Sequence, residues 1–167
     1  MAATDKSQLI VYHTITGGIL QMDRAAAAGA AQEAGVVITM LSASESGPAH
    51  ALAADGFIFA TPANLPSIAG ALKDFFDRSY YAVLGRINGR PSASLVCAGS
   101  DGSNAALQIQ RIATGRRLRS VAVPLIVCTH AQTPEEILRA KQIAAADLER
   151  CAALGATMAS GLALGIF

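Results

Sequence analysis

Tryptophan is absent from the 167 residues, and only 15% of them are charged. Lysine and arginine number 13 against 12 aspartates and glutamates, which leaves a formal net charge of +1. This near balance argues against a nucleic-acid-binding protein, because such proteins usually carry a strong basic excess.

Cysteine is scarce, and Cys97, Cys128 and Cys151 form no CxxC pair. Because no histidine lies at metal-ligand spacing and the cysteine count is odd, we expect no metal, no disulfide framework and a reducing cytoplasm. The N-terminal residues lack the basic and apolar regions of a signal peptide. The uncharged tail, Ala152 to Phe167, is shorter than the ~20 residues that span a bilayer, so we expect a cytoplasmic protein without a membrane partner.

Apolar runs alternate with helical patterns along the whole chain. The runs predict strands at residues 8–12, 36–41, 57–60, 94–98 and 121–127, the last interrupted by Pro124. Helices are expected at residues 18–34, 50–54, 67–78 and 104–113, with Gly35 and Gly115 as stops. The sequence Thr133-Pro134-Glu135-Glu136 is typical of a capping box and predicts one long final helix that continues past Cys151. These elements predict one α/β domain over residues 1–167, with helices on both faces of a five-stranded parallel sheet.

A loop that can hold a phosphate follows the first strand. Thr14, Thr16, Gly17 and Gly18 stand between an apolar run and an Ala-rich helix. Unpaired N–H groups at a helix start attract anions, and glycines let a ligand approach the backbone. The segment has neither the lysine of a GxxxxGK[ST] loop nor a GxGxxG motif, which favours a single phosphate monoester over a triphosphate or a pyrophosphate.

Two further loops, residues 61–65 and 99–103, follow the third and fourth strands. In open α/β sheets, ligands bind at the carboxyl ends of the strands. Both loops are small, hydroxyl-rich or proline-containing and carry little charge, which suits a planar heterocycle on a phosphate tail.

Three segments together resemble the flavodoxin-like flavoproteins, closest to WrbA-type NAD(P)H:quinone oxidoreductases and NADPH-dependent FMN reductases. They are residues 10–19, the Asp55-Gly56 to Thr61-Pro62 block with the helix after it, and Asn88-Gly89-Arg90-Pro91. In that family, glycine is usual where this chain has Pro66 and an aromatic is frequent where it has Leu65. The resemblance implies a flavodoxin-like three-layer α/β/α sandwich that binds FMN.

By this resemblance, three groups of residues surround the cofactor. The phosphate would be held by Thr14, Ile15, Thr16, Gly17, Gly18 and Ile19, and the ring would be lined by Thr61, Pro62, Ala63, Asn64, Leu65, Gly99, Ser100, Asp101 and Gly102. Backbone N–H groups near residues 63–65 are expected to bond the ring edge. Tyr80 and Tyr81 are candidates for closing the site, while the chemistry itself would be flavin-based, with no catalytic side chain.

The resemblance implies an oxidoreductase that takes hydride from NAD(P)H and passes electrons to a quinone or flavin. Two alternatives stay open: a flavodoxin-type electron carrier, whose usual acidity this chain lacks, and an α/β domain that has lost the flavin. The high mean hydropathy of +0.40 and the uncharged tail suggest a homodimer or homotetramer.

Some residues have both a functional and a plain interpretation. His13 and His130 could move protons, Cys97 could face the cofactor, and the cluster Arg111, Arg116, Arg117 and Arg119 could meet a phosphate of NADPH. A loop histidine, a buried small thiol and a solvated basic edge are the plain interpretations.

Overall fold

The computed structural model describes residues 5–167. The first four residues, which belong to the segment considered for a signal peptide, lie outside it. The described elements are β1 (Lys6–Tyr12), α1 (Gly18–Ala30), β2 (Val36–Ser42), α2 (Pro48–Ala53), β3 (Gly56–Pro62), α3 (Gly70–Val83), β4 (Pro91–Ala98), α4 (Ser103–Gly115), β5 (Arg119–Ser120), β6 (Leu125–Cys128), α5 (Pro134–Leu138) and α6 (Ala145–Ala163).

All strand pairs of the sheet are parallel, in the order β2-β1-β3-β4-β5, and β6 also pairs with β4. β5 pairs with the start of β4 and β6 with its end, so the two short strands share the place of the predicted fifth strand. The separation falls around Pro124, which has no N–H for a ladder. The predicted parallel α/β sheet is confirmed. Of the predicted fifth strand, residues 121–127, only 125–127 are strand, in β6, and β5 lies outside the predicted range.

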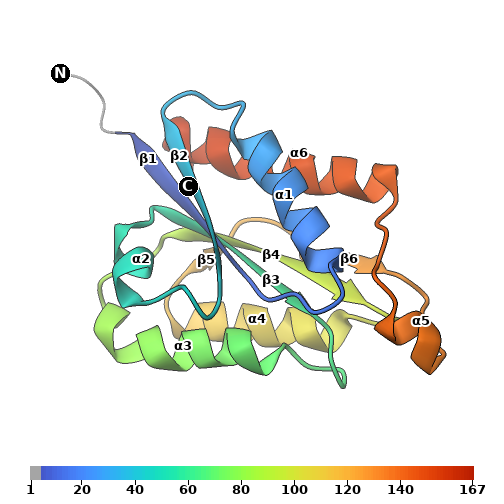
Figure 1. Ribbon diagram of the computed structural model, residues 1–167. Coiled ribbons are helices and arrows are strands. Elements are labelled where there is room, and N and C mark those ends of the chain that lie inside the picture. The colour runs from blue at the N-terminus through green and yellow to red at the C-terminus, as the bar shows by residue number, and fades with distance from the viewer. Residues whose placement is uncertain (1–4) are drawn as a thin grey trace.

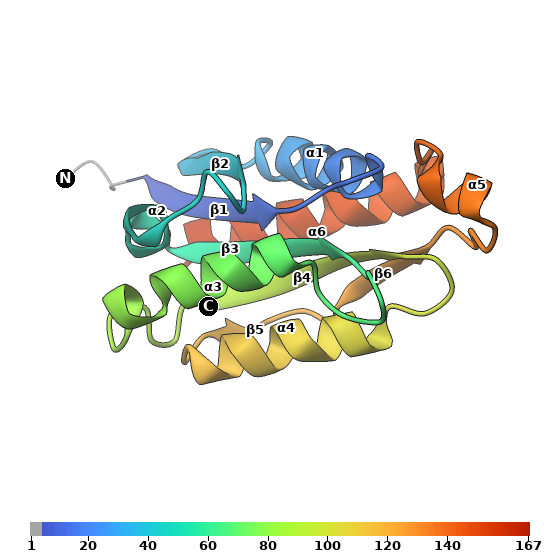
Figure 2. The ribbon, with the colours of Figure 1, turned by 60° about the horizontal axis from the view of Figure 1, so that its bottom comes forward.

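Two layers of helices cover the sheet, as Figures 1 and 2 show. α1 and α6 lie on one face, over a core that includes Ile10, Ile58 and Leu95. α3 and α4 lie on the other face, over a core that includes Phe59 and Phe75. Because side chains alternate along a strand, neighbouring residues of β1 and β3 enter different cores.

α1 and α6 cross at unusually short range. A Cβ on Gly29 would overlap the Ala152 carbonyl, and one on Gly155 would overlap the Ala26 carbonyl. The absence of side chains at the crossing therefore lets the two backbones touch. Among the helices of residues 5–167, none combines the length and hydropathy needed to cross a bilayer.

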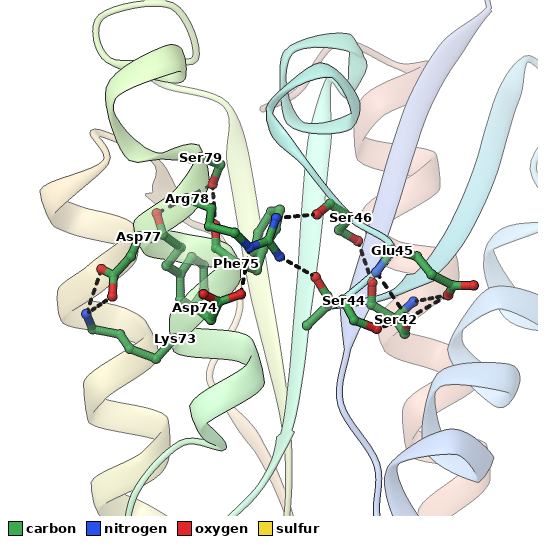
Figure 3. A network of polar contacts seen from close by, with 12 residues as sticks. Ser42, Ser44, Glu45, Ser46, Lys73, Asp74, Phe75, Asp77, Arg78 and Ser79 are labelled. Atoms are coloured by element: carbon green, nitrogen blue, oxygen red, sulfur yellow. Dashed lines mark hydrogen bonds and ion pairs between the residues drawn. The ribbon is translucent and has the colours of Figure 1, made fainter.

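Several arginines bond backbone carbonyls and thereby tie loops to helices. Figure 3 shows Arg78 of α3 paired with Asp74 and donating to the carbonyl of Ser46, in the loop after β2. Arg90 donates to the carbonyls of Ala51, Leu52 and Ala54 at the end of α2. These contacts brace the loops around the sheet and leave fewer cations for ligands.

Several predicted helix boundaries were wrong, including those of α2, which covers Pro48–Ala53 and not residues 50–54. α1 ends at Ala30, and Gly35, with a φ of 78°, lies in the turn before β2 instead of at the helix end. α3 begins at Gly70, because the N–H of Ser67 closes a turn with Asn64 and the N–H of Ala69 bonds the Thr61 hydroxyl. It also continues to Val83, and Gly115 is the last residue of α4 instead of its stop.

The predicted long final helix is also wrong. The capping box at Thr133 and Glu136 forms, but α5 stops at Leu138 and α6 starts at Ala145. Between them, the N–H of Lys141 bonds the carbonyl of Thr16 in the loop before α1. Residues 139–144, which we call the strap, thus lie against the first loop instead of continuing the helix.

Candidate functional site

A cavity of about 650 Å³ lies where the three predicted loops meet, at the carboxyl ends of β1, β3 and β4. This size is ordinary for a site that binds a small molecule or cofactor. Its lining includes these predicted residues: Thr14, Ile15, Thr16, Gly18, Ile19, Pro62, Ala63, Asn64, Leu65, Gly99, Ser100 and Asp101. Gly17, Thr61 and Gly102 are not part of the lining.

The first loop has the geometry of an anion cradle. Gly17 precedes α1 with a φ of 86°, a conformation that L side chains rarely adopt, and no side chain caps the helix start. The first N–H groups of α1 therefore have no intrahelical acceptor and carry the positive end of the helix dipole. Gly18 is confined, because a Cβ there would lie 2.8 Å from the Cys97 Sγ atom.

Thr14 supplies an unpaired hydroxyl to this cradle. Its Oγ1 atom is buried and has no hydrogen-bond partner among residues 5–167, although Thr14 lines the cavity. A buried polar atom left unpaired costs about 1–3 kcal/mol. The loop thus has a hydroxyl at the cavity that no protein group of the described residues satisfies and that is available to a ligand.

The second loop is a tight, rigid turn. Asn64 and Ser67 exchange two backbone hydrogen bonds of 3.0 Å, and Leu65 between them has a φ of 49°. Asn104 of α4 donates to the Pro66 carbonyl. The turn presents the Leu65 side chain, 93% exposed, at the rim of the cavity. A strained, exposed apolar residue held this firmly is typical of a binding site.

Few backbone donors remain free in this turn. The N–H of Ala63 bonds the Cys97 carbonyl, the N–H of Asn64 bonds Ser67, and Pro66 has none. Among residues 63–66, Leu65 alone keeps an N–H without an acceptor in the described chain. The expected set of ring-edge donors is therefore reduced to one.

Thr61 and Gly102, which were expected to line the ring, stabilise the fold and do not line the cavity. The Thr61 hydroxyl donates to the Pro62 carbonyl and accepts from the N–H of Ala69, which fixes the entry into α3. A Cβ on Gly102 would lie 2.8 Å from side-chain atoms of Ile126 and Val96, so glycine is needed there for packing.

The third loop contributes a carboxylate. Asp101 accepts hydrogen bonds from the N–H of Ser103 at 2.9 Å and from its hydroxyl at 3.0 Å. The backbone bond, followed by the hydroxyl bond, lowers the pKa of Asp101 below its usual value. Asp101 therefore places a fixed negative charge at the cavity.

Cys97, considered above as a residue facing the cofactor, lines the cavity. Sequence reasoning missed several other lining residues: Pro66, Ala98, Thr129, Ala131, Ile137, Leu138 and Lys141. Thr129 and Ala131 follow β6, and the rule about carboxyl ends could have found them. Ile137 and Leu138 were missed because α5 was predicted to continue into the last helix. Burial raises the pKa of the Cys97 thiol to about 11, so this thiol stays protonated.

Several other candidates lie away from the cavity. Tyr80 and Tyr81 are ten residues or more along α3 from its start, about 15 Å beyond the loops, so the structure does not support their role in closing the site. Arg116 is buried against Phe75 and Phe76 and donates to the Phe76 carbonyl, so it is not part of an exposed basic edge. His130 lines a separate cavity beside β6, and His13 lines neither. Residues 5–167 contain no cluster of three metal-ligating side chains.

Comparison with solved structures confirms the flavodoxin-like fold. A WrbA-like flavodoxin from Agrobacterium tumefaciens superposes with a TM-score of 0.75 at 20% identity, covering 95% of this chain and 98% of that one. A flavodoxin from the domain Archaea gives a TM-score of 0.77 at 16% identity, covering 94% and 99%.

One curated relative is similar in sequence. An NAD(P)H dehydrogenase (quinone) from Acidithiobacillus ferrooxidans is 30% identical over 91 residues, which cover 42% of this chain and 46% of that one. The aligned part thus spans about half the length of the relative. The family model for NADPH-dependent FMN reductases matches residues 49–134, slightly more than half of the chain, and the chain therefore belongs to that family.

Proposed function

We propose that this chain binds FMN in the three-loop cavity and catalyses electron transfer from NAD(P)H to a quinone or a flavin. The family and the curated quinone dehydrogenase relative support this reaction class. The observation that carries the proposal is the unpaired, buried Thr14 hydroxyl beside the glycine-rich start of α1.

The phosphate of FMN fits the donors of the first loop. The Thr14 and Thr16 hydroxyls and the N–H groups around Gly17 and Gly18 are neutral, and the helix dipole favours an anion there. A phosphate oxygen would satisfy the Thr14 hydroxyl, and a charge-assisted bond of this kind contributes about 1.5–3 kcal/mol.

The ring end of FMN fits the other two loops. Pro62, Ala63 and Leu65 offer apolar surface on one side, and residues 99–101 lie on the other. The exposed side chains of Ile15, Leu65 and Leu138 at the rim would lose water when a flat ring enters, which favours binding by about 25 cal/mol per Å² of apolar surface buried.

When bound, FMN supplies hydride acceptance and electron transfer, and the protein binds, orients and tunes it. The free N–H of Leu65 would donate to a polar atom of the ring edge. The Asp101 carboxylate near the cavity would disfavour extra negative charge on the ring. The apolar rim would exclude water from the face at which the donor arrives.

Titration with FMN, followed by flavin fluorescence, tests the first half of the proposal. We expect saturable binding at one FMN per chain and, with NADPH and a quinone present, steady NADPH oxidation. Binding without NADPH oxidation would favour the electron-carrier alternative, and no binding would contradict the cofactor assignment. A homodimer or homotetramer stays a prediction, which sedimentation tests.

A further inference from the structure

We infer that Gln21 is a positioning residue that locks the phosphate loop to the strap and thereby selects FMN over riboflavin. This inference rests on the proposed function. It is carried by a set of hydrogen bonds that joins residues about 120 positions apart in the sequence.

The side-chain amide of Gln21 is fully used. Its Nε2 atom donates to the Gly17 carbonyl at 3.0 Å and to the Lys141 carbonyl at 2.7 Å. Its Oε1 atom accepts from the N–H of Ile143 at 3.1 Å. Two carbonyls and one N–H allow only one orientation of the amide, and no shorter or charged side chain supplies both kinds of contact.

The strap makes one further bond to the loop, from the N–H of Lys141 to the Thr16 carbonyl at 2.8 Å. The strap thus holds the Thr16 carbonyl directly. The Gly17 carbonyl is held by Gln21, through its side chain, which the strap fixes, and through its own N–H at 3.3 Å. Across a planar trans peptide, a carbonyl and the following N–H point in opposite directions. Holding these two carbonyls therefore fixes the directions of the Gly17 and Gly18 N–H groups, which are the donors proposed for the phosphate.

The Lys141 ammonium keeps the strap in shape. It donates to the carbonyls of Glu136, Ile137 and Arg139 at 2.7–2.8 Å, which ends α5 and turns the chain toward the loop. All three N–H groups of this ammonium thus bond carbonyls, which agrees with a phosphate held by neutral donors. The strap is thus a preformed brace, and Gln21 is its side-chain link to the loop.

If Gln21 positions the phosphate loop, replacing it should weaken binding of the phosphate and not of the ring. FMN and riboflavin share the ring, and only FMN carries the phosphate. If Gln21 acts by directing the loop N–H groups, its loss weakens FMN and leaves riboflavin nearly unchanged. A general loss of structure would weaken both ligands together.

The experiment compares Gln21→Leu with Gln32→Leu, a control at an exposed glutamine just after α1. Dissociation constants for FMN and riboflavin are measured by fluorescence. We expect Gln21→Leu to weaken FMN about tenfold and riboflavin less than about twofold, and the control to change neither. Equal weakening of both flavins, or no change, would overturn the inference. Should Gln21→Leu not fold by circular dichroism, Gln21→Met replaces it, since it keeps the unbranched chain length, adds no charge near the phosphate and removes all three bonds.

A second measurement needs no flavin. Trypsin cleaves after Arg139 and Lys141, both within the strap. We expect trypsin to cleave Gln21→Leu faster at these two sites than the wild type and Gln32→Leu. Unchanged cleavage rates would contradict the inference that Gln21 anchors the strap. Wild-type protein that binds neither flavin would contradict the proposed function, while the cleavage rates would still decide whether Gln21 anchors the strap.

Discussion

The guanidinium of Arg116 lies 5.5 Å from the centroid of the Phe76 ring and donates to the Phe76 carbonyl at 3.0 Å. It also donates to the Ser79 hydroxyl, yet no carboxylate pairs with it among residues 5–167. Desolvation by burial is the main reason that its pKa falls to about 10. Arg116 therefore contributes to the fold mainly by packing between α3 and α4.

This packing role predicts different outcomes for two substitutions. Arg116→Met keeps most of the buried volume and removes a poorly solvated charge, so we expect the free energy of unfolding to change by less than about 1 kcal/mol. Arg116→Ala leaves a cavity beside the two rings and should cost about 2–4 kcal/mol. Urea denaturation measures both, with the exposed Arg111→Ala as control. FMN affinity should stay unchanged in all three, and a loss in Arg116→Met would contradict the structural assignment.

Thr14→Val tests the phosphate loop while nearly preserving shape. The apo protein should be as stable as the wild type or up to about 1 kcal/mol more stable, because an unpaired buried hydroxyl is removed. FMN affinity should fall by about 1–3 kcal/mol, since a phosphate partner is lost. Thr39→Val on β2, outside the cavity lining, is the matched control. Unaltered FMN binding in Thr14→Val would exclude the hydroxyl as a phosphate ligand.

Gly17→Ala tests the left-handed entry into α1. With a φ of 86°, alanine at this position is strained, and we expect a loss of about 1–2 kcal/mol in the free energy of unfolding. Gly47 precedes α2 with a φ of −150° and no atom within 4 Å of an added Cβ. Thermal or urea denaturation of Gly47→Ala should therefore match the wild type, and an equal loss in both variants would contradict this assignment.

Asp23 predicts an unusual pH dependence of stability. It is fully buried on α1, neither carboxyl oxygen has a partner among residues 5–167, and burial raises its pKa well above the usual value. The unfolded chain loses this proton near pH 4, whereas the folded chain keeps it, so this carboxyl lowers stability as the pH rises above about 4. Asp23→Asn cannot ionise, so it should be roughly 1–3 kcal/mol more stable than the wild type at pH 7 and nearly equal to it at pH 4.

Urea denaturation at both pH values measures this difference, with the exposed Asp5→Asn as control. A stabilisation of Asp23→Asn that is the same at pH 4 and pH 7 would contradict a raised pKa of this carboxyl in the folded protein.

The phosphate loop could be predicted because its signals are local. A strand ending in hydroxyls, two glycines and a helix start lie within a few consecutive residues, and Gly17 has the positive φ that this pattern requires. The other two loops followed from the rule about strand ends. The family match, residues 49–134, includes these two loops and leaves out the first, so the loop rests on its own residues.

The strap could not be predicted, because its sequence favours helix. Arg139 to Ala146 consists almost wholly of good helix formers. The helix breaks there because the N–H of Lys141 bonds Thr16 instead of Ile137, four residues before it, and the Lys141 ammonium takes the Ile137 carbonyl. This competition is set by a loop at the other end of the chain, which no local pattern reports.

The burial of Arg116 was hidden for a similar reason. Its neighbours Arg111, Arg117 and Arg119 are exposed, and the cluster looked uniform in the sequence. Arg116 differs because it is the residue directly after α4 and its side chain lies against the rings of Phe75 and Phe76 on α3.

The close crossing of α1 and α6 has a consequence for biosynthesis. The contact joins Gly29 to Ala152 and Ala26 to Gly155, so the side of α1 that α6 covers stays open while more than a hundred further residues are made. At ordinary translation speed this interval lasts on the order of ten seconds. In a nascent chain of this protein, this surface of α1 is therefore accessible to chaperones at the ribosome exit until α6 emerges and packs against it.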